Sequence, residues 1–430
     1  MRKGLALLVV LGLMLSLVGV ATIAQASVKV TYWTAPNPTQ EIFWRQLADK
    51  FNASQDKIHV YVTAMVETPT SEATITNAIA GGKAPAASGN IFPGFGATLV
   101  NSEALVPLDT LPGWDELIQK RAMQDIIKSW TFSDGHVYIF PIYANAMLFG
   151  WRIDILRELG FNEPPTTYSG MMKVGEALKA KYPNKFLTAR EALINPTWWQ
   201  RWFDFFMLYN AASDGQPFVT GNSVTADDAA VIKVFRFYGD LKANDYLLTR
   251  KATNPFETGL AVWRDLGPWS FPGWKENWPE LKLGETFVTA PPPLPDDVSY
   301  AHAKTFADAK GLVIYAQRSP EEQAAIWEFI KWVFSDPIND RAWADATGML
   351  PMRGDLSTNQ TFDNVFEEHP ELTGYADEMA YAVPAMANDK FADIQTALGE
   401  KGLIPVILGK KTPEQGWADA KAAIEAILAR

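Results

Sequence analysis

The chain contains no cysteine among its 430 residues. It forms no disulfide, so its stability has to come from a hydrophobic core, and a chain of this length can bury one. A lipid anchor that requires a cysteine is excluded as well. The length predicts two or three domains. The composition, 48% hydrophobic and 20% charged without any low-complexity tract, is that of a globular protein.

Histidine is scarce, and the common catalytic motifs are absent from the sequence. The four histidines lack the spacing of a metal site: His59, His136, His302 and His369. No G-x-S-x-G, H-E-x-x-H, Walker or G-x-G-x-x-G motif occurs. We therefore expect no metal, no cofactor and no catalytic residue. A glycosidase or lyase stays open as the alternative, because its paired carboxylates need no fixed spacing and the chain has 49 acidic residues.

The chain has fewer basic than acidic residues. The chain has 38 basic residues against 49 acidic ones, and without the first 26 residues the basic count falls to 36, which gives a net charge near −13. Such a surface repels phosphate backbones and anionic lipids. We expect neither nucleic acid nor a membrane surface as a partner.

The N-terminus has the pattern of an export signal. Arg2 and Lys3 precede an almost wholly apolar run over residues 4–20, and Ala24-Gln25-Ala26 offers the small-x-small pattern that signal peptidase accepts. An N-terminal membrane anchor is the alternative, because the run is almost long enough to span a bilayer. Small residues follow the run, and no second apolar span occurs. We expect a signal peptide over residues 1–26, cleaved near Ala26, and a periplasmic protein.

Aromatic residues are abundant, with 16 tryptophans, 24 phenylalanines and 13 tyrosines. Most of them belong in the core, because aromatic side chains bury large areas. The surplus suggests a sugar site, since a sugar presents a flat C–H face and a rim of hydroxyls. Such sites pair aromatic platforms with short planar polar groups.

The start of the mature chain predicts an open α/β sheet. Residues 28–33 alternate as a strand, apolar residues then recur every four positions in a helix to about Asn52, and residues 58–63 form the next strand. This β-α-β unit implies a parallel pair. A second helix over residues 71–80 ends at Gly81-Gly82. Ligands of open sheets bind beyond the carboxyl ends of the strands, where we expect the loops 33–37 and 88–92.

An ordered series of short motifs covers nearly the whole mature chain. They are residues 78–85 (AIAGGKAP), 105–109 (LVPLD), 130–141 (WTFSDGHVYIFP), 148–168, 256–269 with Gly267-Pro268-Trp269, 311–332 and 347–353 (TGMLPMR). The series resembles the family 1 extracellular solute-binding proteins, the maltose-binding-protein-like receptors of carbohydrate ABC importers. Two positions depart from the family pattern: Ala86 replaces an aspartate and Leu260 replaces a lysine. The departures bear on the ligand more than on the fold.

The resemblance implies the type II periplasmic binding protein fold, with two α/β lobes, a ligand cleft and three hinge crossings. We expect lobe one over residues 27–109 and 291–338, and lobe two over 110–290 and 339–430. The implied function is that of an extracytoplasmic receptor, a monomer, which binds a sugar or polyol and closes around it. The closed form would deliver it to the permease subunits of an ABC importer. A receptor that feeds a chemosensor would have the same fold.

Two candidate ligand residues follow from the strand ends, each with a structural alternative. Trp33 is placed just past the first strand, where its ring faces either the cleft or the core. Asn90 is placed in the loop after the third strand, where its amide suits either sugar hydroxyls or a turn.

The resemblance adds three candidates. Tyr143 and Asn145 fall where relatives have a sugar-contacting side chain near the hinge, and maltose-binding protein has a carboxylate at the place of Asn145. Trp269 aligns with an aromatic stacking platform, with core packing as the alternative.

Three further candidates complete the predicted site. Trp199 belongs to an aromatic-rich helix that starts at Pro196, and it points away from Trp198 and Trp202, which we assign to the core. Asp308 precedes the strand that contains Gly311, at the cleft mouth or in a solvated loop. Arg353 offers a planar fork for ligand oxygens or a bridge between the lobes. The sequence leaves the ligand open among glycans, monosaccharides, polyols and glycerol-phosphate-like compounds.

Overall fold

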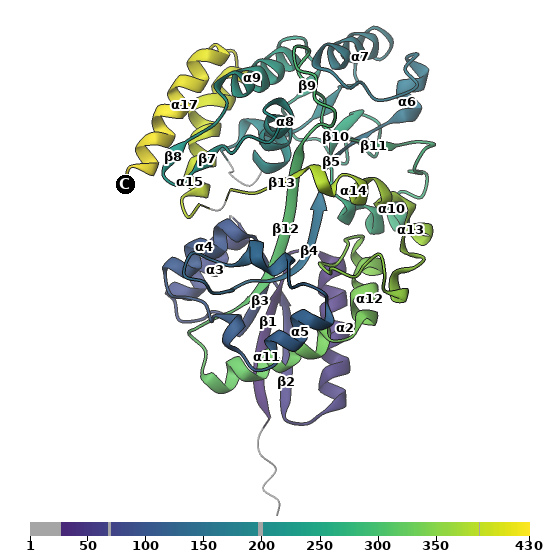
Figure 1. Ribbon diagram of the computed structural model, residues 1–430. Coiled ribbons are helices and arrows are strands. Elements are labelled where there is room, and N and C mark those ends of the chain that lie inside the picture. Colours follow the sequence, from purple (N-terminus) through teal and green to yellow (C-terminus); the bar gives the residue numbers. More distant parts are fainter. Residues whose placement is uncertain (1–26, 68–69, 197–200, 387) are drawn as a thin grey trace, which may run out of the picture.

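The computed structural model describes residues 27–67, 70–196, 201–386 and 388–430. Two α/β lobes lie one above the other and are joined by long strands (Figure 1). The predicted signal peptide, residues 1–26, lies outside the described residues. Among those that are described, no helix is long and apolar enough to cross a membrane.

The main sheet of the first lobe has the order β13-β12-β3-β1-β2, with β4 also paired to β12. Its strands are β1 (Val28–Thr34), β2 (Ile58–Ala64), β3 (Ala87–Ile91), β4 (Phe140–Ala146), β12 (Thr305–Ile314) and β13 (Ala382–Pro384). Strand β1 is parallel to both β2 and β3, whereas β12 is antiparallel to β3 and β4. The carboxyl ends of β1, β2 and β3 therefore point toward the second lobe (Figure 1).

The first two helices follow the predicted pattern. Helix α2 (Pro38–Ser54) buries Phe43, Leu47 and Phe51, and its N-cap Asn37 accepts hydrogen bonds from the backbone of Thr39 and Gln40. Helix α3 (Ser71–Ala80) follows β2, and Gly82 beyond its end has a φ of +66°, a conformation that glycine adopts without strain. The parallel β-α-β unit at the N-terminus is thereby confirmed.

Two further helical segments pack against the first lobe. Trp114 of α5 (Trp114–Lys120) stacks on Trp327 of α11 (Pro320–Phe334), with ring centroids 6.1 Å apart. Trp343 of α12 (Pro337–Thr347) packs edge-on against Phe43 of α2. Helices α5 and α12 thus lie with the first lobe (Figure 1), although the expected boundaries assign α5 and all of α12 after residue 338 to the second.

The second lobe consists mainly of helices around a small sheet of order β10-β5-β11. Its elements are as follows: α6 (Ile153–Glu158), α7 (Tyr168–Lys181), α8 (Met207–Ala212), α9 (Asp228–Ala243), α10 (Phe271–Asn277), α14 (Thr373–Asp377), α15 (Phe391–Ala397), α16 (Ile404–Ile407), α17 (Pro413–Leu428), β5 (Leu148–Trp151), β10 (Trp263–Leu266) and β11 (Val288–Ala290). Phenylalanine, tyrosine and tryptophan rings fill much of its core, including Phe205, Phe235 and Trp263.

The chain passes between the lobes three times. Strands β4 and β12 run side by side from one lobe to the other, and the third passage lies between α12 and α14 (Figure 1). The third passage is attached to β4 by the backbone hydrogen bond from Met352 to Ile142, 2.7 Å long. A ligand between the lobes would therefore lie against these three segments.

Candidate functional site

A cavity of about 210 Å³ lies where the two lobes meet. Fifteen residues from both lobes and from the connecting strands line it: Ala35, Pro36, Asn37, Gln40, Glu67, Ser71, Glu72, Asn90, Tyr143, Trp202, Phe203, Trp269, Asp308, Lys310 and Met349. This site cavity lies beyond the carboxyl ends of β1, β2 and β3, the place where open α/β sheets bind ligands.

One wall of the site cavity is polar and comes from the first lobe. Asn37 and Gln40 lie at the start of α2, and Ser71 and Glu72 lie at the start of α3. Both helices therefore direct their N-terminal ends toward the site cavity, where the helix dipole is positive. The burial of Glu72 raises the pKa of its carboxyl. This wall offers amide, hydroxyl and carboxylate groups to a ligand.

Asn90 reaches the site cavity through an irregularity in a strand. It lies within β3 rather than in a loop after it, and its φ is +63°. The register of β3 against β12 shifts at this point. Asparagine tolerates the left-handed conformation better than most residues, and a bulge redirects the side chain. The predicted loop position was wrong, because the strand continues through the bulge to Ile91.

The two long crossing strands contribute a polar group. Tyr143 on β4 pairs with Lys310 on β12, and Asn145 pairs with Asp308 two residues further along. Side chains alternate along a strand, so these four residues share one face of the ribbon. Asp308 is only 3% exposed, and its carboxylate lies 3.7 Å from the Lys310 ammonium. The solvated-loop interpretation of Asp308 was wrong, because β12 begins at Thr305 and buries it.

The electrostatics of this ribbon follow from burial. Desolvation raises the pKa of Asp308, while the neighbouring Lys310 and the hydrogen bond from Tyr143 oppose that rise. Burial, followed by the charge of Asp308, raises the pKa of the Tyr143 hydroxyl well above its ordinary value. Tyr143 therefore remains a neutral hydrogen-bond donor at neutral pH, and Asp308 is its acceptor.

The opposite wall is aromatic and comes from the second lobe. Trp269 lies in the short helical turn η5 (Pro268–Ser270), and Phe203 lies in the π-helical segment η4 (Trp202–Phe206). Their ring centroids are 5.9 Å apart, and both rings are partly exposed. Trp202 also lines the site cavity, although it is 4% exposed. Hydrogen-bonding groups thus face aromatic rings across the site cavity.

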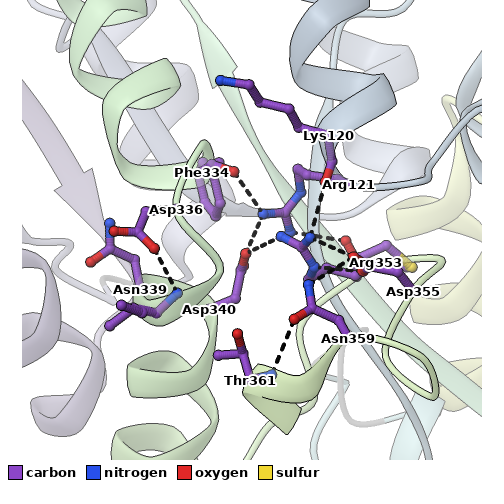
Figure 2. Close-up of polar contacts among 12 residues, drawn as sticks. Lys120, Arg121, Phe334, Asp336, Asn339, Asp340, Arg353, Asp355, Asn359 and Thr361 are labelled. Carbon is purple, nitrogen blue, oxygen red and sulfur yellow. Dashed lines mark hydrogen bonds and ion pairs between the residues drawn. The ribbon is translucent and has the colours of Figure 1, made fainter.

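Arg353 lies outside the site cavity, in a buried ion network (Figure 2). Its guanidinium contacts Asp340 at 2.8 Å and Asp355 at 2.8 Å, and donates to the backbone oxygen of Lys120 at 3.1 Å. Arg121, fully buried, pairs with the same Asp340 oxygen at 2.5 Å. The network attaches the third passage to α5 and α12. Arg353 therefore binds other segments of the protein instead of a ligand.

The other predicted residues differ in their placement. Trp33 lies within β1, not past its end, and packs against the core instead of lining the site cavity. Asn145 is 2% exposed and lies beside the site cavity rather than in its lining, and its Nδ2 has no hydrogen-bond partner among the described residues. Trp199 lies outside the described residues. The structure brings together Asn90, Tyr143, Trp269 and Asp308.

Several lining residues were missed by the sequence interpretation. Glu67 and Glu72 follow β2 just as the candidate loops follow β1 and β3, so the strand-end rule applied to all three strands would have found them. Lys310 lies two positions from Asp308, a polar alternation typical of one strand face. Phe203 offered no comparable signal, because several other aromatic residues surround it in the sequence.

One group of described residues brings potential metal ligands together, away from the site cavity. Oxygen and nitrogen atoms of Asp345, Glu368 and His369 lie within 4.8 Å of one another. Arg341 already pairs with both carboxylates, at 2.8 Å from Asp345. Both acidic residues are exposed, so nothing in this arrangement distinguishes it from a surface ion-pair cluster.

A cavity between two α/β lobes, crossed by three connecting segments, defines a two-lobed binding protein. The chain belongs to the bacterial extracellular solute-binding proteins, whose family pattern matches residues 46–374. It is similar to an uncharacterized protein of Listeria monocytogenes EGD-e, with 44% identity over 94% of this chain and 100% of the other, and a TM-score of 0.77. The family consists of binding proteins, not enzymes.

Two solved structures of lower identity share the fold. The GacH receptor of Streptomyces glaucescens, solved unliganded and with acarbose, is 19% identical over 94% of this chain and 99% of its own, with a TM-score of 0.75. The maltose/maltodextrin-binding domain of Bdellovibrio bacteriovorus, bound to maltotriose, is 16% identical over 94% of this chain and 100% of its own, with a TM-score of 0.75.

Proposed function

We propose that the protein is the sugar receptor of an ABC importer and that it binds a saccharide in the site cavity. The observation that carries the proposal is the pairing of two unlike walls. Trp269 and Phe203 offer ring faces on one side, and amides and carboxylates lie opposite them. A sugar has a C–H face for the rings and hydroxyls for the polar wall.

Each wall has its own task in this account. Trp269 stacks on one face of a sugar ring, with Phe203 fixing the orientation of its indole. Asn90, Asp308 and Lys310 exchange hydrogen bonds with the hydroxyls, and the charged members form the stronger bonds. The saccharides bound by the GacH receptor and by the Bdellovibrio protein support this assignment, since both proteins share the fold.

Ligand binding is coupled to closure of the two lobes in this account. We place α5 and α12 in the first lobe because of their packing. The chain then crosses between the lobes near β4, near β12 and in the passage after Thr347. A saccharide that touches both lobes stabilises the closed arrangement by its extra contacts. The permease subunits then recognise that arrangement. The receptor acts as a periplasmic monomer after cleavage near Ala26.

The proposal is tested by a thermal-shift screen of residues 27–430 against mono-, di- and oligosaccharides, polyols and glycerol phosphates. A ligand at one hundred times its dissociation constant stabilises the native state by about 2.7 kcal/mol, which raises the melting temperature by several degrees. The expected result is a saccharide hit that is recovered chemically unaltered. A hit confined to glycerol phosphates, or a saccharide that is hydrolysed, would overturn the proposal.

A further inference from the structure

A second cavity, of about 250 Å³, adjoins the site cavity on the side of the second lobe. Trp202 lines both cavities. The remaining lining comes from the helical region after Trp202, from residues 216–219, from β12 and from residues 383–386: Phe206, Asn210, Gln216, Pro217, Phe218, Val219, Phe306, Val383, Pro384, Ala385 and Met386. Gln216, Pro217 and Pro384 are exposed, so solvent reaches this apolar chamber.

The chemistry of the apolar chamber differs from that of the site cavity. Eight of the fifteen residues around the site cavity carry a charged, amide or aliphatic hydroxyl group, against two of the twelve around the apolar chamber. The donor of each amide is engaged: Asn210 Nδ2 donates to the backbone oxygen of Thr305 at 3.1 Å, and Gln216 Nε2 donates to the backbone oxygen of Thr225 at 2.6 Å. Among the lining side chains a sugar hydroxyl placed there would find only the two amide oxygens, so it would lose more hydrogen bonds to water than it regains.

The inner walls of the apolar chamber are closely packed aromatic rings. The Trp202 ring is stacked on Phe306, with centroids 5.7 Å apart and planes 19° apart. Phe206 packs edge-on against Phe218, with centroids 5.2 Å apart. Each of these four side chains is at most 5% exposed. Packed rings of this kind form a preformed surface for a flat apolar group.

The combined volume of the two spaces is large enough for one ligand that extends through both. Sites for small organic ligands typically measure about 300–1,000 Å³. Neither the site cavity, at about 210 Å³, nor the apolar chamber, at about 250 Å³, reaches that range alone, but the two together do. The shared wall at Trp202 makes the two spaces neighbours.

We propose that the ligand is a glycoside, with its sugar in the site cavity and an apolar aryl or alkyl group in the apolar chamber. The sugar half of this inference rests on the proposed function. The apolar half rests on the chamber lining, because burial of an aryl group there removes apolar surface from water. A phenyl group that enters the chamber is expected to tighten binding about tenfold or more.

The experiment compares matched pairs of probes by titration calorimetry: the methyl and phenyl glycosides of D-glucose and of maltose, in both anomers. The wild-type protein should bind a phenyl glycoside at least about tenfold more tightly than its methyl partner. Ala385→Phe narrows the apolar chamber without touching the site cavity, so it should abolish the difference and leave the methyl glycoside affinity within about twofold. Ala422→Phe, on the exposed face of α17, is the matched control and should retain the full difference.

Each outcome distinguishes the inference from the proposed function. Equal affinities within every pair would overturn the apolar half and leave the sugar receptor intact, and so would a difference that persists in Ala385→Phe. If no glycoside binds, the proposed sugar receptor fails with these probes. The apolar chamber is then tested separately with benzene, which apolar cavities bind. Benzene-induced NMR shifts at the methyls of Val219 and Val383, absent in Ala385→Phe, would support the chamber; no shifts would overturn it.

Discussion

Tyr143 on β4 stands opposite Lys310 on β12, and both residues line the site cavity. The two strands also connect the lobes (Figure 1), so hydrogen-bonding groups of the site lie on the connection itself. A ligand that holds these groups in one arrangement restricts the strands that carry them. In the proposed function, ligand binding and lobe geometry are therefore coupled through these same residues.

Replacement of Trp269 by alanine should weaken saccharide binding at least about tenfold, because the stacking surface is lost. Titration calorimetry with the best saccharide from the screen measures the effect. Trp269→Phe should recover part of the affinity, since it retains a ring. Trp332→Phe, on α11 and remote from the site cavity, is the control. An unchanged affinity in Trp269→Ala would contradict the stacking role.

Asp308→Asn should raise thermal stability and weaken binding together. Burial raises the pKa of Asp308 in the folded protein, so its charged form opposes folding at neutral pH. The contribution of the carboxyl to stability is complete below its unfolded pKa and is lost as the pH rises through the raised folded pKa. The variant should therefore melt at a higher temperature than the wild type at pH 7, and this difference in melting temperature should shrink on acidification.

The pH dependence of this difference in melting temperature tests the explanation. Differential scanning calorimetry of the wild type and of Asp308→Asn, from pH 7 down to pH 3.5, gives the difference at each pH. Asp56→Asn, at an exposed position, is the matched control. A difference in melting temperature between Asp308→Asn and the wild type that stays constant with pH would contradict the electrostatic explanation.

Asp340→Asn should destabilise the protein by about 3–5 kcal/mol, because it leaves Arg121 and Arg353 buried without their shared carboxylate. Urea unfolding measures the loss. The saccharide affinity of the folded fraction should change little, since the network (Figure 2) lies outside the site cavity. Asp125→Asn, in a solvent-exposed pair with Lys128, is the control and should leave the unfolding midpoint in place. A comparable loss in both variants would contradict the account.

Gly311→Ala should destabilise the connection between the lobes. A Cβ at Gly311 would lie 2.3 Å from the backbone oxygen of Phe140, where β12 and β4 shift register. We expect a loss of about 1–3 kcal/mol in urea unfolding, typical of overpacking. At Gly273 in α10 a Cβ would meet nothing within 4 Å, so Gly273→Ala should be neutral or slightly stabilising. Full tolerance of Gly311→Ala would show that the strands separate easily.

Saccharide binding should reduce the radius of gyration measured by small-angle X-ray scattering, because the lobes close on the ligand. The reduction should be absent in Trp269→Ala at the same saccharide concentration and should return only when that concentration exceeds the weakened dissociation constant. A saturated protein whose scattering curve matches that of the free protein would contradict closure.

Local sequence patterns were sufficient for the first part of the fold. The bounds of β1, α2 and α3 were predicted to within a few residues. The signals were the alternation of the strand, the four-residue apolar period and the Gly81-Gly82 helix end, which all depend on neighbouring positions. The strand-end rule and the resemblance together placed Asn90 and Trp269 at the site cavity. The bulge that directs Asn90 has no local signal, since it forms where β3 meets β12 far along the chain.

Long-range contacts explain two of the residues that were misplaced. The planar guanidinium of Arg353 can pair with a ligand or with a protein carboxylate, and the sequence does not distinguish the two. Its partners Asp340 and Lys120 lie on α12 and α5, which reach it only through long-range packing. Asp308 looked solvated because charged residues usually are. Its burial depends on the antiparallel pairing of β12 with β4, which joins residues more than 160 positions apart.

The most direct test of the central claim is a crystal structure of residues 27–430 with the strongest saccharide from the screen. The account predicts a sugar ring stacked on Trp269 between the lobes, with hydroxyls bonded to Asn90 and to the Asp308–Lys310 pair. A saccharide bound elsewhere, with the site cavity free of it, would contradict the account.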